Sequence, residues 1–221
     1  MKNYIIGIGG TGAKCLEHLL HCCTAGLGPN NLWAGMVDQD EANGNVSKTK
    51  ILLNKYMNLR SNLRNESGND LAKKSNLFKT QITANADSVW LPMKGANPTL
   101  EELINYNLLK PEVKGLMDCL YDPDELKQNL SEGFRARPNI GAAAILSTTA
   151  NEDDIFWSQI YKAIDAARGG EEVRVFIISS IFGGTGASGF PNIARRIRQI
   201  QKDKNVSSNF HLGGALMLPY F

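Results

Sequence analysis

A short apolar run followed at once by a glycine-rich turn constrains the fold more than any other feature of this sequence, and it occurs twice. Residues 3–6 are typical of a buried strand and lead into a glycine turn at residues 7–12. Residues 173–180 form a nearly continuous apolar run, typical of a covered parallel strand, and lead into a second glycine loop at 182–189. Repeated strand–loop–helix units of this kind predict an α/β protein with a mainly parallel sheet.

The rest of the pattern extends this prediction. A helix is expected from residue 13 to about 24, and a second strand at 32–37. A helix with an acidic, capped first turn is expected to run from residue 151 to about 168, and residues 211–218 indicate a last strand. The helix after the second glycine loop carries three isoleucines at helical spacing, Ile193, Ile197 and Ile200. We therefore expect a Rossmann-like sheet with helices on both faces.

The stretch at about 45–132 has a different character. It is rich in Lys, Asn and Ser, shows weak helical periods and has no continuous apolar run typical of a strand. Thr99 and Glu102 match a capping box, and residues 122–130 suggest another short helix. Near residue 141 an apolar run begins that fits a helix or a strand. We interpret residues 1–221 as one nucleotide-binding domain with a helical and loop insertion at about 45–132.

Composition excludes several classes of protein. The chain has 24 Lys and Arg against 22 Asp and Glu, which is too balanced for a nucleic-acid footprint, and its helical arginines Arg195, Arg196 and Arg198 are interpreted as a solvated surface. No run approaches the roughly 20 apolar residues that a membrane span requires. Four cysteines without metal or disulfide spacing favour a reducing cytoplasm.

The glycine loops carry the chemistry. A glycine turn between a strand and a helix directs backbone N–H groups at an anion, and the helix dipole adds to their attraction. Alone, the Gly7-x-Gly9-x-x-Gly12 pattern also fits an NAD(P)-binding Rossmann domain of an oxidoreductase, with Asp38 or Asp40 near a ribose. The second loop favours another interpretation, in which two loops at neighbouring strand ends close on one phosphate chain.

With these loops in place, the sequence resembles the tubulin/FtsZ superfamily. Residues 183–189 are similar to its phosphate loop, GGGTG[ST]G, and residues 7–12 resemble its first loop. Residues 38–40 occupy the place of its second loop, whose acidic residue lies near magnesium and phosphates, and residues 136–141 resemble its third loop. Residues 216–221 fall where its fourth strand ends in a proline-aromatic turn. The resemblance covers a little over half of the chain and implies GTP or GDP with Mg²⁺.

The resemblance also implies a set of site residues. The nucleotide is expected to contact Gly9, Gly10, Thr11, Gly12, Lys14, Asp38, Gln39, Asp40, Arg137, Asn139, Gly183, Gly184, Thr185, Gly186, Ala187 and Ser188. Asp40, or Asp38, is expected to reach Mg²⁺ through water. Lys14 is either a phosphate ligand or a solvated helix lysine, and Arg135 and Arg137 either sense the terminal phosphate or lie on the surface.

The function implied is head-to-tail self-assembly controlled by GTP, with hydrolysis in the complete polymer and further protein partners through the insertion. The stretch between the second and third loops is longer than in FtsZ, which indicates a divergent bacterial lineage. The sequence ends where the family continues into guanine-reading residues and the hydrolysis loop, so the second half of the family fold is expected to be absent. A scaffold that binds GTP without hydrolysing it is the remaining alternative.

Overall fold

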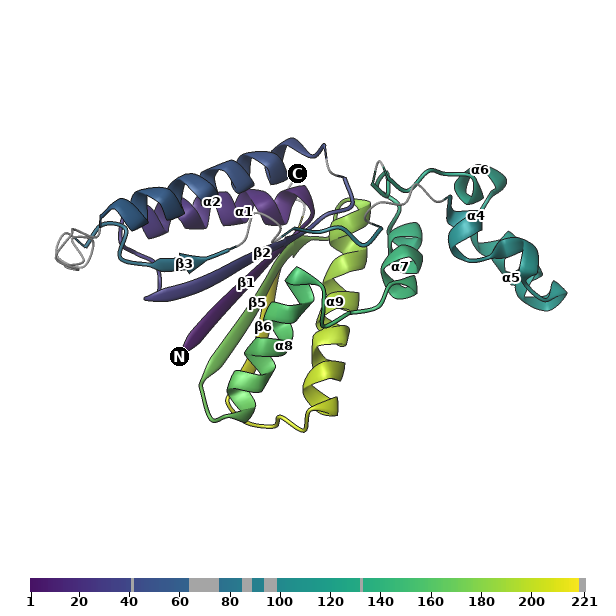
Figure 1. The fold of residues 1–221 in the computed structure, drawn as a ribbon. Coiled ribbons are helices and arrows are strands. Elements are labelled where there is room, and N and C mark those ends of the chain that lie inside the picture. Colours follow the sequence, from purple (N-terminus) through teal and green to yellow (C-terminus); the bar gives the residue numbers. More distant parts are fainter. Residues whose placement is uncertain (41, 64–75, 85–88, 94–98, 132, 219–221) are drawn as a thin grey trace.

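A parallel sheet forms the centre of the computed structural model, which describes residues 1–40, 42–63, 76–84, 89–93, 99–131 and 133–218. The strands lie in the order β3-β2-β1-β5-β6, and β4 also pairs with β2 (Figure 1). Their bounds are Lys2–Ile8 for β1, Asn31–Val37 for β2, Gln81–Thr83 for β3, Val89–Trp90 for β4, Val173–Ser180 for β5 and Phe210–Met217 for β6. All of the strand pairs are parallel, so their carboxyl ends meet at one edge.

Helices cover both faces of this sheet. The pair α1 and α2 lies on one face, and α8 and α9 lie on the other, with α7 packed against α9 (Figure 1). The helices are α1 at Gly9–Thr24, α2 at Gly44–Asn62, α4 at Leu100–Leu103, α5 at Pro111–Leu120, α6 at Pro123–Leu126, α7 at Pro138–Ser147, α8 at Ile155–Arg168 and α9 at Gly184–Asp203. The α/β fold class expected from the sequence is therefore confirmed.

The core explains why the strongest sequence patterns were reliable. The run at 173–180 forms β5 at the same bounds, beside the central strand β1, where Ile6 pairs with Ile177 and both are buried. On α9, Ile193, Ile197 and Ile200 are buried against the sheet, as expected. Burying one such side chain fully is worth about 1.5–3 kcal/mol, so these two elements anchor the fold.

The segment at 45–132 contains more of the sheet than the sequence indicated. We expected only helices and loops there, but β3 and β4 extend the sheet beside β2, and α2 packs against α1. The two strands have three and two residues, which is too short for an alternating pattern to show. The capping box at Thr99 is confirmed, whereas the expected helix at 122–130 shortens to α6.

Two further expectations are settled by packing. The run near residue 141 is helical and forms α7. Arg196, expected on a solvated surface, is instead half-buried: its guanidinium donates to the backbone oxygens of Ile145, at 3.1 Å, and Thr148, at 2.5 Å. Because the last carbonyls of a helix lack partners within it, Arg196 on α9 closes the end of α7.

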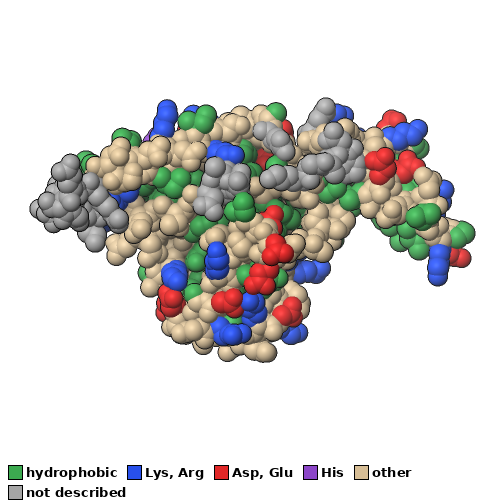
Figure 2. Space-filling model, viewed as in Figure 1, with side chains coloured by type: hydrophobic (Ala, Val, Ile, Leu, Met, Phe, Trp, Pro, Cys, Tyr) green, Lys and Arg blue, Asp and Glu red, His purple; other side chains and the backbone are tan. Residues whose placement is uncertain are grey.

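The segment with α4, α5 and α6 projects from the body (Figure 1). Apolar side chains gather on its exposed end (Figure 2), where Leu108, Val113, Leu116 and Leu120 are exposed. Within the described ranges, we find no helix with the length and apolar character needed to cross a membrane.

Candidate functional site

The two glycine loops lie against each other at the carboxyl edge of β1 and β5. Gly9 has φ +71°, and a methyl group added there would lie 3.4 Å from the backbone nitrogen of Gly186. A methyl group on Gly12 would lie 2.7 Å from the backbone of both Gly7 and Ile178. The first turn of α1 therefore approaches both strands too closely for any residue with a side chain.

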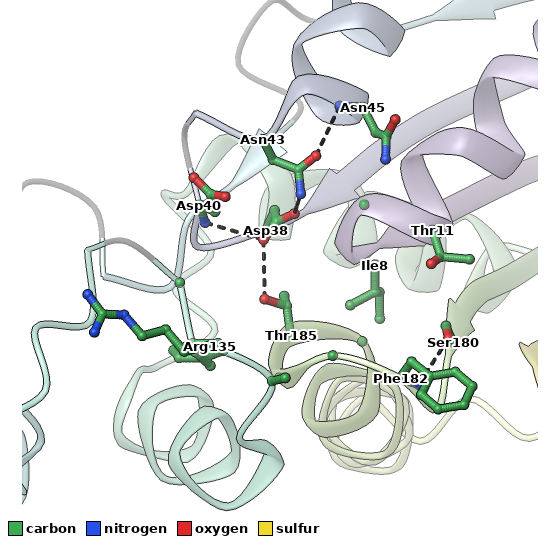
Figure 3. Close-up of a pocket in the computed structure, with 17 residues that line it drawn as sticks. Ile8, Thr11, Asp38, Asp40, Asn43, Asn45, Arg135, Ser180, Phe182 and Thr185 are labelled. Carbon is green, nitrogen blue, oxygen red and sulfur yellow. Dashed lines mark hydrogen bonds between the residues drawn. The ribbon is translucent and has the colours of Figure 1, made fainter. Parts of the chain in front are cut away.

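A cavity of about 440 Å³ opens between these loops (Figure 3). Eight of the expected site residues line it: Gly10, Thr11, Asp38, Asp40, Gly183, Gly184, Thr185 and Gly186. They come from the ends of three neighbouring parallel strands, which is the position where ligands bind in open α/β sheets.

The two helices that begin in the glycine loops lack the side-chain caps found at most other helix starts. The side chains of Asn43, Thr99, Asp122 and Asp154 accept backbone hydrogen bonds at the starts of α2, α4, α6 and α8. In contrast, α1 and α9 begin at Ile8 and Gly183 with no side-chain cap, no proline and no acidic residue in the first turn. Of the other described α-helices, α5 and α7 also lack a side-chain cap, but both begin with proline. The N-cap residues of α1 and α9 thus supply no side-chain acceptor for the first backbone N–H groups, and uncapped donors of this kind can bind an anion.

Asp38 holds the surrounding loops together (Figure 3). Its carboxylate accepts hydrogen bonds from the Thr185 hydroxyl at 3.2 Å, the Asn43 amide at 3.0 Å and the Asp40 backbone N–H at 3.2 Å. Burial raises the pKa of Asp38 to about 6, while the bonds from Asp40 and Thr185 act in the opposite direction. This side chain therefore connects the end of β2 to the start of α9 and, through Asn43, to the start of α2.

The segment at 133–136, which leads into the expected third loop at 136–141, forms another wall of the cavity. Arg135 and Ala136 line it and have φ +43° and +59°, a conformation that non-glycine residues seldom adopt. Phe134, which is buried, contacts the position where a side chain on Gly184 would stand, so this segment packs directly on the start of α9. Two consecutive left-handed residues persist only where surrounding contacts hold them, as at many binding sites.

Other expected site residues lie outside the lining. The Gln39 amide oxygen accepts a hydrogen bond from the Met93 backbone at 2.8 Å, and Arg137 pairs with Glu125 at 3.2 Å. The Ser188 hydroxyl donates to the Gly184 carbonyl oxygen at 2.5 Å. Gly9 and Gly12 shape the first turn, and the remaining three, which also do not line the cavity, are Lys14, Asn139 and Ala187.

Several residues that line the cavity were not predicted from the sequence. Asn43 and Asn45 stand beside Gly10, because α2 packs against α1. A helix start at Asn43 was readable as an N-cap signal, but its position at the cavity depends on that packing. Ser180, the last residue of β5, and Phe182, the first residue of the second loop, also line the cavity. Among the residues the structure places, there is no group of three or more His, Cys, Asp or Glu side chains that could hold a metal ion by itself.

Comparison with known proteins fits this geometry. No curated protein and no solved structure matches the chain significantly. A family model described as tubulin-like, however, matches residues 4–221, and so spans both glycine loops, the third loop and the segment between them. The chain therefore belongs to the tubulin-like family, within the tubulin/FtsZ superfamily.

Proposed function

We propose that this protein binds GTP with Mg²⁺ in the cavity between its two glycine loops, and that the nucleotide controls head-to-tail self-assembly. The observation that carries the proposal is the pair of uncapped helix starts, α1 and α9, at one cavity. Two helix N-termini supply backbone donors and two positive dipole ends, which together favour a polyanion.

The residues present fit a nucleoside triphosphate. Backbone N–H groups of residues 10–12 and 184–186 would hold the phosphates, with the Thr11 hydroxyl exposed at the same rim. Arg135, immediately before the third loop, lines the cavity and carries a positive charge. The glycines at these positions leave the backbone uncovered, so that phosphate oxygens can approach it.

The cavity also fits the way Mg²⁺ binds with nucleotides. This ion retains several waters and takes one or two carboxylates together with phosphate oxygens. Both oxygens of Asp38 already accept hydrogen bonds within the protein, whereas Asp40 is less buried and lines the cavity. We therefore assign Asp40, through water, as the carboxylate that serves Mg²⁺, whose charge would neutralise the phosphates.

Guanine as the base, and self-assembly as the outcome, are proposed on family membership. A head-to-tail contact is heterologous and forms open filaments when its rotation does not close. An NAD(P)-binding Rossmann domain would use the first loop alone and would leave the start of α9 without a ligand. The contact between Gly9 and Gly186 argues for one ligand that meets both loops.

A charge placed in the first turn of α1 tests the proposal. Thr11→Glu should leave the free protein folded, because an acid at a helix N-terminus stabilises it by about 0.3–1 kcal/mol. Two like charges about 4 Å apart near a protein surface repel by roughly 4 kcal/mol, so the variant should lose nucleotide binding. The measurement is the thermal midpoint with GTP and Mg²⁺, compared with ATP and with NAD.

Ile155→Glu is the matched control. It adds an acid to the first turn of α8, at an exposed position outside the cavity, in a helix that has no acid there. The wild type and this control should gain several degrees with GTP, and Thr11→Glu should gain none. Equal gains in all three proteins, or a gain with NAD and none with GTP, would overturn the proposal.

Assembly needs a separate measurement. Sedimentation of this chain with GTP and with GDP, alongside phosphate release, separates nucleotide-driven polymers from a scaffold that binds without turnover. The proposal expects more pelleted protein with GTP than with GDP. Pelleting that is independent of nucleotide would contradict control by GTP.

A further inference from the structure

The cavity has two chemically different sides (Figure 3). Asp40 and Arg135 lie on one side, with Asp38 and Thr185 between them and the centre. Phe182 lies on the opposite side, beside Ser180. Charged groups that suit phosphates and Mg²⁺ are thus separated from a planar apolar ring across the same cavity.

The ring of Phe182 is exposed in a way that core packing does not explain. Its side chain is 53% exposed, and it joins none of the three apolar clusters formed by the described residues. By comparison, Phe134 and Phe156 are almost fully buried. An aromatic ring that stays in water does not gain the free energy of burial. A bound ligand that covered the ring would gain it.

The backbone at Phe182 is fixed rather than free. Its N–H donates to the Ser180 hydroxyl at 3.0 Å, and Ser180 is itself buried at the end of β5. On the other side, Gly183 has φ +82° and forms the start of α9, so the ring stands directly before the expected phosphate donors. Phe182 therefore lies in the same cavity as the expected phosphate donors, on the side opposite Asp40.

We propose, on the basis of the proposed function, that Phe182 stacks on the base of the bound nucleotide and so holds the base on the side of the cavity opposite Asp40. Every base has a π-face, and stacking one on an aromatic side chain is sequence-tolerant. The terminal phosphate then points toward Asp40 and Arg135.

The test compares a nucleotide with a phosphate chain that has no base. Isothermal titration with Mg²⁺ measures the affinity for GTP and for inorganic tripolyphosphate in the wild type, Phe182→Ala, Phe182→Leu and Phe182→Tyr. Stacking free energies imply that Phe182→Ala binds GTP about 5- to 150-fold more weakly. Phe182→Leu keeps apolar bulk without the ring and should lose most of this affinity, whereas Phe182→Tyr should retain it. Tripolyphosphate should bind all four proteins equally.

Phe176→Ala is the matched control, because Phe176 is another partly exposed phenylalanine, 40% exposed on β5, and does not line the cavity. It should bind GTP like the wild type. If GTP binds and Phe182→Ala binds it equally well, the stacking role is wrong while the proposed function stands. An equal loss of tripolyphosphate affinity would show that Phe182 only shapes the loop. If neither GTP nor tripolyphosphate binds the wild type, the proposed function itself fails.

Discussion

Helices α9 and α5 both carry an apolar stripe, but the stripe is buried on α9 and exposed on α5. On α9, Ile193 and Ile197 face the sheet and are fully buried. On α5, no residue is buried, and the stripe of Val113, Leu116 and Leu120 is exposed. The comparison shows that apolar residues at helical spacing are enough to indicate a helix. They add to the stability of the fold only where another apolar surface packs against them.

Two polar contacts join α5 to Tyr106. The Lys114 ammonium lies 4.5 Å from the centre of the Tyr106 ring, and the Tyr106 hydroxyl donates to Asp118. Exposed contacts of this kind contribute little, typically below 1 kcal/mol each. We therefore expect the segment with α5 to open more readily than the sheet and its covering helices.

The largest expected effect is a cavity in the body. Ile197→Ala removes a fully buried side chain between α9 and the sheet and should lower the free energy of unfolding by about 2–5 kcal/mol. Leu116→Ala on α5 should change it by less than about 0.5 kcal/mol, because that side chain is 56% exposed. Urea unfolding followed by circular dichroism measures both. Similar losses in the two variants would remove the contrast.

The buried carboxyl of Asp38 gives the next largest effect. In the folded, metal-free protein its pKa is about 6, above the usual 3.8, because the charged form is desolvated. Both states hold the proton well below pH 3.8, the pKa of the carboxyl in the unfolded chain. Between pH 4 and 6 the unfolded chain releases it first, so stability falls as pH rises, by about 3 kcal/mol in all.

Asp38→Asn cannot ionise and should lack this fall, whereas Asp124→Asn, on the projecting segment, should retain it. The measurement is the free energy of unfolding from pH 3.5 to 7.5, in chelator and without nucleotide. A wild type and an Asp38→Asn variant with parallel pH profiles would show that Asp38 is not the group responsible.

Two glycines, one in α1 and one in α5, give the smallest expected changes in stability and compare the two regions directly. A methyl group on Gly12 of α1 would lie 2.7 Å from two backbone atoms, and Gly12→Ala should cost about 1–3 kcal/mol of unfolding free energy. Gly115 of α5 has no atom within 4 Å of that position, so Gly115→Ala should stabilise its helix by about 0.5–1 kcal/mol. Hydrogen exchange of α5 amides measures the gain, and global unfolding measures the loss. A stabilised Gly12→Ala would contradict the close approach of the first loop to β1 and β5.

Elements with a strong local sequence pattern were predicted correctly. Residues 173–180 form β5 at the expected bounds, because a long apolar run indicates a buried strand whatever lies next to it in the sheet. Strands β3 and β4 were not predicted, because they are too short to show an alternating pattern and form by pairing with β2. Gln39 was expected at the site, but its side chain accepts a hydrogen bond from the backbone N–H of Met93, which is distant in the sequence.

The two strand–loop–helix units follow from the sequence alone, because Gly7, Gly12 and Gly186 lie where another part of the backbone comes too close for any side chain. Which side chains meet at the cavity depends instead on tertiary packing. Asn43 and Asn45 arrive there through the packing of α2 on α1, and Arg135 and Ala136 through the contact of Phe134 with the start of α9. The physical reason is that strand-end loops are close in space through the sheet order, β2-β1-β5, which local patterns do not contain.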